Sequence, residues 1–278
     1  MTDHVAGKSI VITGAGGGFG SLVARKVAAR GAKVTLGDIN LAAAEAVATE
    51  IRDAGGQAQA VQVDVTKLAQ VKALVAAAVS AYGSVEVMLN NAGIMPLAFI
   101  ADHEAAYDAW ERCIDINIKG VLNGMVAAHD PMIAAGKGHL INVSSIYGNF
   151  PVTGAAVYGA SKSAVNFLSE SLRVETRGKI KVTIVKPTGV PATGLSGTVI
   201  NPEASVGILG QNAALFGEMV AGMQDGSFPA ERLDPENIDY ASLAPEHIAD
   251  AIVHAIDQPW GVSIGDITVR GAGDHFIL

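Results

Sequence analysis

The sequence predicts an α/β fold in which a doubly wound parallel sheet of seven strands forms a single domain. Short apolar runs alternate along the chain with longer, alanine-rich segments of helical character. The runs are nearly continuous and rich in β-branched residues, as expected of parallel strands that are buried on both faces. The predicted strands are 9–13, 33–37, 58–63, 85–89, 139–143, 180–185 and 264–269.

Helical segments fill the intervals between these runs. We expect helices over 21–30, 41–54, 67–82 and 155–177. Asn40 and Thr66 are placed to cap the second and third, and Pro245 suits the first turn of the last helix.

We expect residues 1–278 to form one domain, because no composition shift, proline-rich linker or repeat divides them. The regular alternation breaks at 188–243, which contains an apolar, helix-like piece at 204–223. Sheets of this class bind ligands at the carboxyl ends of their strands, so we expect this insertion to cover the substrate as a lid.

The composition limits the classes of partner. A net charge of −8 disfavours nucleic acid and anionic membranes, and the apolar stretches are too short for a membrane span. The single cysteine, Cys113, permits no intrachain disulfide, and the histidines form no metal-binding pattern, so no metal is expected. The first residues do not resemble a signal peptide, and a cytoplasmic location is expected.

A glycine-rich turn follows the first predicted strand and opens the first helix. It reads Thr13-Gly14-Ala15-Gly16-Gly17-Gly18-Phe19-Gly20. In that position glycines let the backbone approach a pyrophosphate at the helix N-terminus, which favours a Rossmann-type dinucleotide site over a merely flexible turn. Asp38 ends the second strand, where a carboxylate accepts hydrogen bonds from the ribose of NAD and repels the 2′-phosphate of NADP. Alternatively, Asp38 caps the next helix.

Tyr158 and Lys162 lie four residues apart, and Ser145 lies upstream of them. On a helix this spacing holds an ammonium beside a phenol, so we expect Lys162 to lower the pKa of Tyr158. Such a tyrosine can exchange a proton with an alcohol near neutral pH. Taken alone, the pair also fits a tyrosine packed at a helix edge beside a solvated lysine.

Together these motifs resemble the short-chain dehydrogenase/reductase family over essentially the whole chain. The matching residues, in order, are Thr13-Gly14-x-x-x-Gly18-x-Gly20, Asp64-Val65, Asn90-Asn91-Ala92-Gly93, Asn117, Ser144-Ser145, Tyr158-x-x-x-Lys162, Pro187 and Gly189. The resemblance implies NAD-dependent hydride transfer between a secondary alcohol and a ketone, and a homodimer or homotetramer.

The resemblance also implies roles for individual residues. The implied catalytic residues are Asn117, Ser145, Tyr158 and Lys162. The implied cofactor-binding residues are Gly14, Gly18, Phe19, Gly20, Asp38, Ile39, Asp64, Val65, Asn91, Ala92, Gly93, Tyr158, Lys162, Pro187, Gly189, Val190 and Thr193. Asp64 is implied to contact adenine, or else it is a turn residue. Asn117 is implied to hold a water beside Lys162, or it stabilises a helix irregularity.

The chain departs from the family pattern after the sixth strand. Thr188 stands where the family usually has glycine, and a later threonine is displaced to Thr193. Either threonine, or the backbone of Val190, is a candidate contact for the nicotinamide carboxamide.

The expected substrate is a small, neutral and apolar molecule, of cyclic, aromatic or steroid-like type. Candidate substrate contacts are Met95, Ser145, Tyr147, Phe150, Leu195 and Phe216, although each apolar one also fits core packing. Arg232 is the only Lys or Arg in 187–269, and phosphate or carboxylate recognition normally needs such residues. Three alternatives remain: an NADP(H)-dependent reductase, a non-catalytic NAD-binding regulator, and an epimerase or dehydratase.

Overall fold

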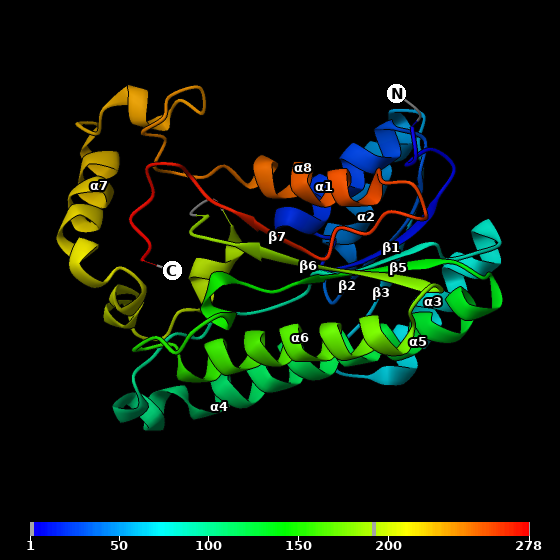
Figure 1. Cartoon of the computed structure of the whole chain (residues 1–278), viewed down its shortest axis with the longest axis horizontal. Coiled ribbons are helices and arrows are strands. Elements are labelled where there is room, and N and C mark those ends of the chain that lie inside the picture. Colours follow the sequence, from blue (N-terminus) through cyan, green and yellow to red (C-terminus); the bar gives the residue numbers. More distant parts are fainter. Residues whose placement is uncertain (1–2, 191–192, 278) are drawn as a thin grey trace.

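The seven predicted strands form one parallel sheet in the computed structural model, which describes residues 3–190 and 193–277 (Figure 1). The strand order is β3-β2-β1-β4-β5-β6-β7. The strands are β1 (Ser9–Thr13), β2 (Lys33–Asp38), β3 (Gln57–Gln62), β4 (Val87–Asn90), β5 (Gly138–Val143), β6 (Ile180–Pro187) and β7 (Asp266–Val269). The order reverses between β1 and β4, which is where sheets of this class place their ligands. The predicted fold class is therefore confirmed.

Helices cover both faces of the sheet (Figure 1). One face packs against α1 (Gly18–Ala29), α2 (Leu41–Asp53) and α8 (Pro245–Ile256). The other packs against α3 (Leu68–Tyr82), α5 (Gly120–Ala134) and α6 (Ala156–Glu175). Successive strand residues point to opposite faces, so Ile10 and Ile12 join the first core while Val11 joins the second. This explains why the strand sequences are apolar throughout.

Of the three residues predicted to mark the start of a helix, Asn40 and Pro245 are confirmed and Thr66 is not. The Asn40 side chain accepts a hydrogen bond from the backbone N–H of Ala43 at 3.1 Å, so Asn40 caps α2 as predicted. Pro245 lies in the first turn of α8. The prediction for Thr66 is wrong, because Lys67 is the residue before α3 and makes no side-chain cap. The Thr66 hydroxyl instead donates to the Asp64 carboxylate at 2.7 Å.

The helices between residues 100 and 134 were not predicted, because no single helical period runs through this part of the sequence. There α4 (His103–Cys113) continues through a π-helical segment (Ile114–Lys119) into α5. A π turn inserts one extra residue, so the apolar face shifts and no single 3.6-residue period spans the junction.

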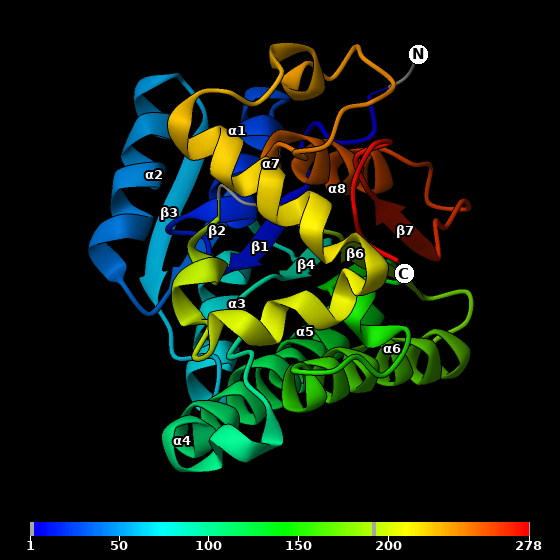
Figure 2. The same ribbon diagram turned by 90° about the vertical axis from the view of Figure 1, so that its left-hand side faces the viewer.

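The insertion lies across the carboxyl ends of the strands (Figures 1 and 2). Among its described residues, 188–190 and 193–243, the one α-helix is α7 (Ala213–Asp225). The helix predicted over 204–223 is wrong in its first part, which consists of 3₁₀ turns at Pro202–Ile208 and Gly210–Asn212. Gly210 has a φ of +52°, which interrupts helical continuity there.

Replacing Asn40 by alanine should lower the free energy of unfolding by about 1 kcal/mol, because an N–H in the first turn of α2 loses its acceptor. Urea unfolding would measure the loss. Asn40→Ser keeps an acceptor oxygen and should recover most of the stability. If serine proves as destabilising as alanine, the capping bond is not the cause.

Candidate active site

Three elements bring the predicted catalytic residues together at the carboxyl edge of the sheet. α6 carries Tyr158 and Lys162, Ser145 follows β5, and Asn117 lies in the π-helical segment. All four side chains are buried. The Lys162 Nζ atom lies 5.7 Å from the centroid of the Tyr158 ring, as the four-residue helical spacing requires.

The side chain of Lys162 is held by a backbone carbonyl at the end of β5. Its Nζ atom donates to the carbonyl oxygen of Val143 at 2.9 Å. Burial lowers the pKa of Lys162 to about 8. Gly93 lies between the two polar groups, since a Cβ atom there would lie 3.2 Å from Asn117 Oδ1 and 3.6 Å from Lys162 Nζ.

The pKa of Tyr158 does not follow the prediction from spacing. Burial raises it well above the ordinary value, and a hydrogen bond with Ser145 opposes that rise. The expected lowering by Lys162 is therefore wrong for the chain alone. Burial of the phenol dominates, and the Lys162 ammonium lies over the ring, with Nζ 5.7 Å from its centroid.

Asn117 stabilises the helix irregularity, which was one of its two predicted roles. Its Oδ1 atom accepts from the N–H of Ile94 at 3.0 Å, and its Nδ2 atom donates to the carbonyl of Ile94 at 2.9 Å. Nδ2 also donates to Ser161 Oγ at 3.0 Å, and Ser161 in turn donates to the carbonyl of Tyr158 at 2.7 Å. The amide thus links the π-helical segment, the chain after β4 and α6.

The glycine-rich turn forms a close-packed backbone cradle. Gly14 and Gly18 have φ values of +65° and +51°. A Cβ atom at Gly20 would lie 2.3 Å from the carbonyl oxygen of Gly14, so no larger residue fits there. Asn91 closes the turn from β4 by donating from Nδ2 to the carbonyls of Thr13 and Gly14, both at 3.0 Å.

The first turn of α1 fits a pyrophosphate. Gly17 precedes the helix without any side-chain cap, and a Cβ atom at Gly17 or Gly18 would meet open space. Uncapped N–H groups at a helix N-terminus attract anions. These residues therefore fit the pyrophosphate of a dinucleotide, which is the ligand expected from the glycine-rich sequence.

The two predicted acids lie at successive strand ends. Asp38 Oδ2 accepts from the N–H of Gly16 at 2.8 Å, which holds the carboxylate against the glycine-rich turn. Its Oδ1 accepts from the N–H of Asn40 at 2.9 Å. Asp64 accepts from the N–H of Thr66, so its turn role is present. Neighbouring Val65 packs against Gly120.

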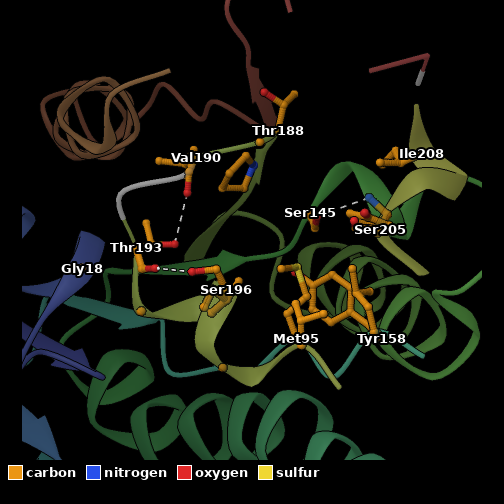
Figure 3. A pocket seen from close by; sticks show the side chains of 18 of the residues that line it. Gly18, Met95, Ser145, Tyr158, Thr188, Val190, Thr193, Ser196, Ser205 and Ile208 are labelled. Carbon is orange, nitrogen blue, oxygen red and sulfur yellow. Dashed lines mark hydrogen bonds between the residues drawn. The ribbon is translucent and has the colours of Figure 1, made fainter. Parts of the chain in front are cut away.

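A cavity of about 670 Å³ runs from the glycine-rich turn to Tyr158 and on beneath the insertion. Figure 3 shows Met95, Ser145 and Tyr158 around one end and Thr193 toward Gly18. The predicted residues that line it are Gly14, Gly18, Phe19, Asn91, Ala92, Gly93, Met95, Ser145, Tyr147, Tyr158, Lys162, Pro187, Thr188, Gly189, Val190, Thr193, Leu195 and Phe216.

Other predicted residues do not line the cavity. Phe150 is 61% exposed, so its prediction as a substrate contact is wrong. It follows the short 3₁₀ turn Ile146–Gly148, and that turn directs Tyr147 rather than Phe150 to the cavity. Gly20, Asp38, Ile39, Asp64, Val65 and Asn117 lie outside the lining as well.

Several lining residues were not predicted. Phe276, near the C-terminus, packs so closely on Gly189 that a Cβ atom there would lie 2.1 Å from Phe276 Cζ. Ser205, Ile208 and Met223 of the insertion also line the cavity. The apolar tail His275-Phe276-Ile277 after the last strand was the one available sequence signal.

Neither 3–190 nor 193–277 contains a group of three or more His, Cys, Asp or Glu side chains that could hold a metal ion. No helix within these ranges has both the length and the apolarity to cross a bilayer.

Comparisons with known proteins agree with this geometry. The family model described as short chain dehydrogenase matches residues 8–203. The chain is 35% identical over 96% of its length to a glycine betaine reductase of Emericella nidulans, but it spans only 19% of that protein. It is 37% identical to a 2,5-dichloro-2,5-cyclohexadiene-1,4-diol dehydrogenase of Sphingobium indicum, over 68% of this chain and 76% of the relative.

A solved structure extends the likeness to three dimensions. A metagenomic short-chain oxidoreductase in complex with NADP superposes with a TM-score of 0.72 at 27% identity, covering 96% of this chain and 98% of the other. The family-model match covers more than half of the sequence, and Ser145, Tyr158 and Lys162 line one cavity with the glycine-rich turn. This chain therefore belongs to the short-chain dehydrogenase/reductase family of oxidoreductases.

Proposed function

We propose that this protein interconverts neutral secondary alcohols and ketones, with NAD(H) as its cofactor. The observation that carries the proposal is the cavity itself, which joins the glycine-rich turn to Ser145, Tyr158 and Lys162. One end fits a dinucleotide and the other holds an acid–base pair next to an apolar space.

NAD is proposed over NADP because of Asp38. Its carboxylate lies against the N–H of Gly16, where it can accept hydrogen bonds from ribose hydroxyls. A 2′-phosphate at that position would meet a like charge. NADP remains the second candidate, since the related metagenomic oxidoreductase was solved with it.

The catalytic residues have complementary tasks. In the oxidative direction Tyr158 accepts the proton of the substrate hydroxyl, while Ser145 donates a hydrogen bond to the same oxygen. Lys162 uses one of its three N–H donors on the Val143 carbonyl and has two left to donate to ribose hydroxyls. A nicotinamide bound at this end supplies the hydride acceptor and, when oxidised, a positive charge that favours the Tyr158 phenolate.

Charge within the cavity supports a neutral substrate. Among the described residues that line it, Lys162 is the one charged side chain. Phosphate and carboxylate groups normally require Arg or additional Lys partners. The diol dehydrogenase from Sphingobium supports a cyclic alcohol as the substrate.

A homo-oligomer is part of the proposal. Exposed apolar side chains gather on the outer helices, with Leu122 and Val126 on α5 and Phe167 and Val174 on α6. Phe167 is 76% exposed, which is unusual for a side chain of its size unless another surface covers it.

Tyr158→Phe should reduce turnover by about two to four orders of magnitude, because the proton acceptor is lost while the ring remains. NAD affinity, measured by calorimetry, should change little, which controls for folding. The assay follows NADH absorbance with a panel of neutral cyclic alcohols. Turnover close to that of the parent protein would refute the assignment.

Asp38→Asn should weaken the preference for NAD over NADP by about tenfold to a hundredfold, because the charge that repels the 2′-phosphate is removed. Asparagine keeps an acceptor for the N–H of Gly16. Titration of both nucleotides would measure the ratio, with Asp53→Asn on the exposed end of α2 as control. A parent protein that binds NADP more tightly than NAD would contradict the proposal.

A further inference from the structure

A second tyrosine stands beside the catalytic one. The rings of Tyr147 and Tyr158 pack edge to face, with centroids 5.4 Å apart and an interplanar angle of 69°. Both residues line the cavity. Tyr147 follows Ser145 by two positions, so it belongs to the same strand end as a catalytic residue.

The position of Tyr147 is fixed by its neighbours. Its N–H donates to Ser145 Oγ at 3.2 Å. The next residue, Gly148, packs directly on α6, where a Cβ atom would lie 2.8 Å from the backbone of Lys162. The Gly148 carbonyl accepts hydrogen bonds from the side chains of Ser163 and Asn166 at 2.9 and 3.1 Å. The Tyr147 backbone is therefore anchored to the helix that carries Tyr158 and Lys162.

The same contact leaves the Ser145 proton available. Ser145 Oγ accepts from the N–H of Tyr147, which leaves its own O–H to donate to Tyr158 or to a substrate oxygen. The reacting oxygen of an alcohol or ketone then has two partners, Ser145 and Tyr158.

Tyr147 brings a third hydroxyl to the residues that line this end of the cavity. Burial raises its pKa well above the ordinary value, so it stays protonated and can donate. It makes no hydrogen bond to any residue in the described part of the chain, unlike three other cavity hydroxyls. Those donate to backbone carbonyls: Thr193 to Val190, Ser196 to Thr193, and Ser205 to Pro202.

We propose that the Tyr147 hydroxyl binds a second oxygen of the substrate, and that the substrates are neutral cyclic diols or cyclic hydroxyketones. This inference rests on the proposed function and narrows its substrate class. A phenol in an apolar cavity favours a ligand that satisfies its hydrogen bond over one that leaves it unpaired. Tyr147 is thus a specificity-determining residue, separate from proton transfer.

Tyr147→Phe tests the proposal, because it removes the hydroxyl and keeps both the ring and the backbone N–H. NADH formation would be followed with cyclohexanol and with cyclohexane-1,2-diol and cyclohexane-1,4-diol. The parent protein should prefer at least one diol, and the variant should lose about tenfold to a hundredfold in kcat/KM for that diol. Its kcat/KM for cyclohexanol should stay within about twofold of the parent value, since no hydrogen bond to this substrate is lost.

Tyr107→Phe is the matched control, since Tyr107 is an exposed tyrosine on α4 outside the cavity. It should leave both rates unchanged. If Tyr147→Phe keeps the parent's kcat/KM for both the diols and cyclohexanol, the inference is overturned while the proposed function stays intact. An equal loss with all three alcohols would also overturn it, because that result indicates a general role at the reacting centre. Absence of NADH formation with every alcohol would instead refute the proposed function itself.

Discussion

The pairing of the Asn117 side chain with both backbone groups of Ile94 is the constraint on which the catalytic geometry depends. It holds the π-helical segment against the chain that follows β4. Through Ser161 it also reaches the carbonyl of Tyr158 on α6. A buried amide with these partners is costly to disturb, because each broken bond leaves a polar group unpaired away from water. These hydrogen bonds thereby fix the chain after β4, the π-helical segment and α6 relative to one another.

The sequence predicted the fold well because its main signals are local. Strand runs, the Asn40 cap and the glycine-rich turn each depend on residues close together in the chain, and all are present. The continuous helix from His103 to Ala134 escaped prediction because the π turn changes the phase of its apolar face. Predicted strand ends lie within two residues of the observed ones, and the first strand matches at both ends, because hydrogen bonding decides where a strand stops.

Sequence motifs identified the residues near Tyr158, but they could not identify the cavity wall, which is set by packing between distant segments. Tyr158, Lys162, Ser145 and Asn117 do converge. The wall of the cavity depends on contacts between distant segments, so Phe276 was missed and Phe150 was wrongly included. The pKa of Tyr158 was assigned the wrong direction for a related reason. Spacing shows the neighbouring charge, but the extent of desolvation appears only when the whole chain has folded.

The packing of Phe276 on Gly189 makes the far end of the chain part of the cavity wall. Its neighbours secure the tail: Ile277 donates from its N–H to the carbonyl of Ile208, and the Asn212 side chain donates to the carbonyl of His275. During synthesis the nucleotide half of the cavity can form long before this wall exists. A change in the Phe276 segment would therefore disturb Gly189 and the space beneath the insertion before the glycine-rich turn, and binding at that turn would be a poor indicator of an intact cavity.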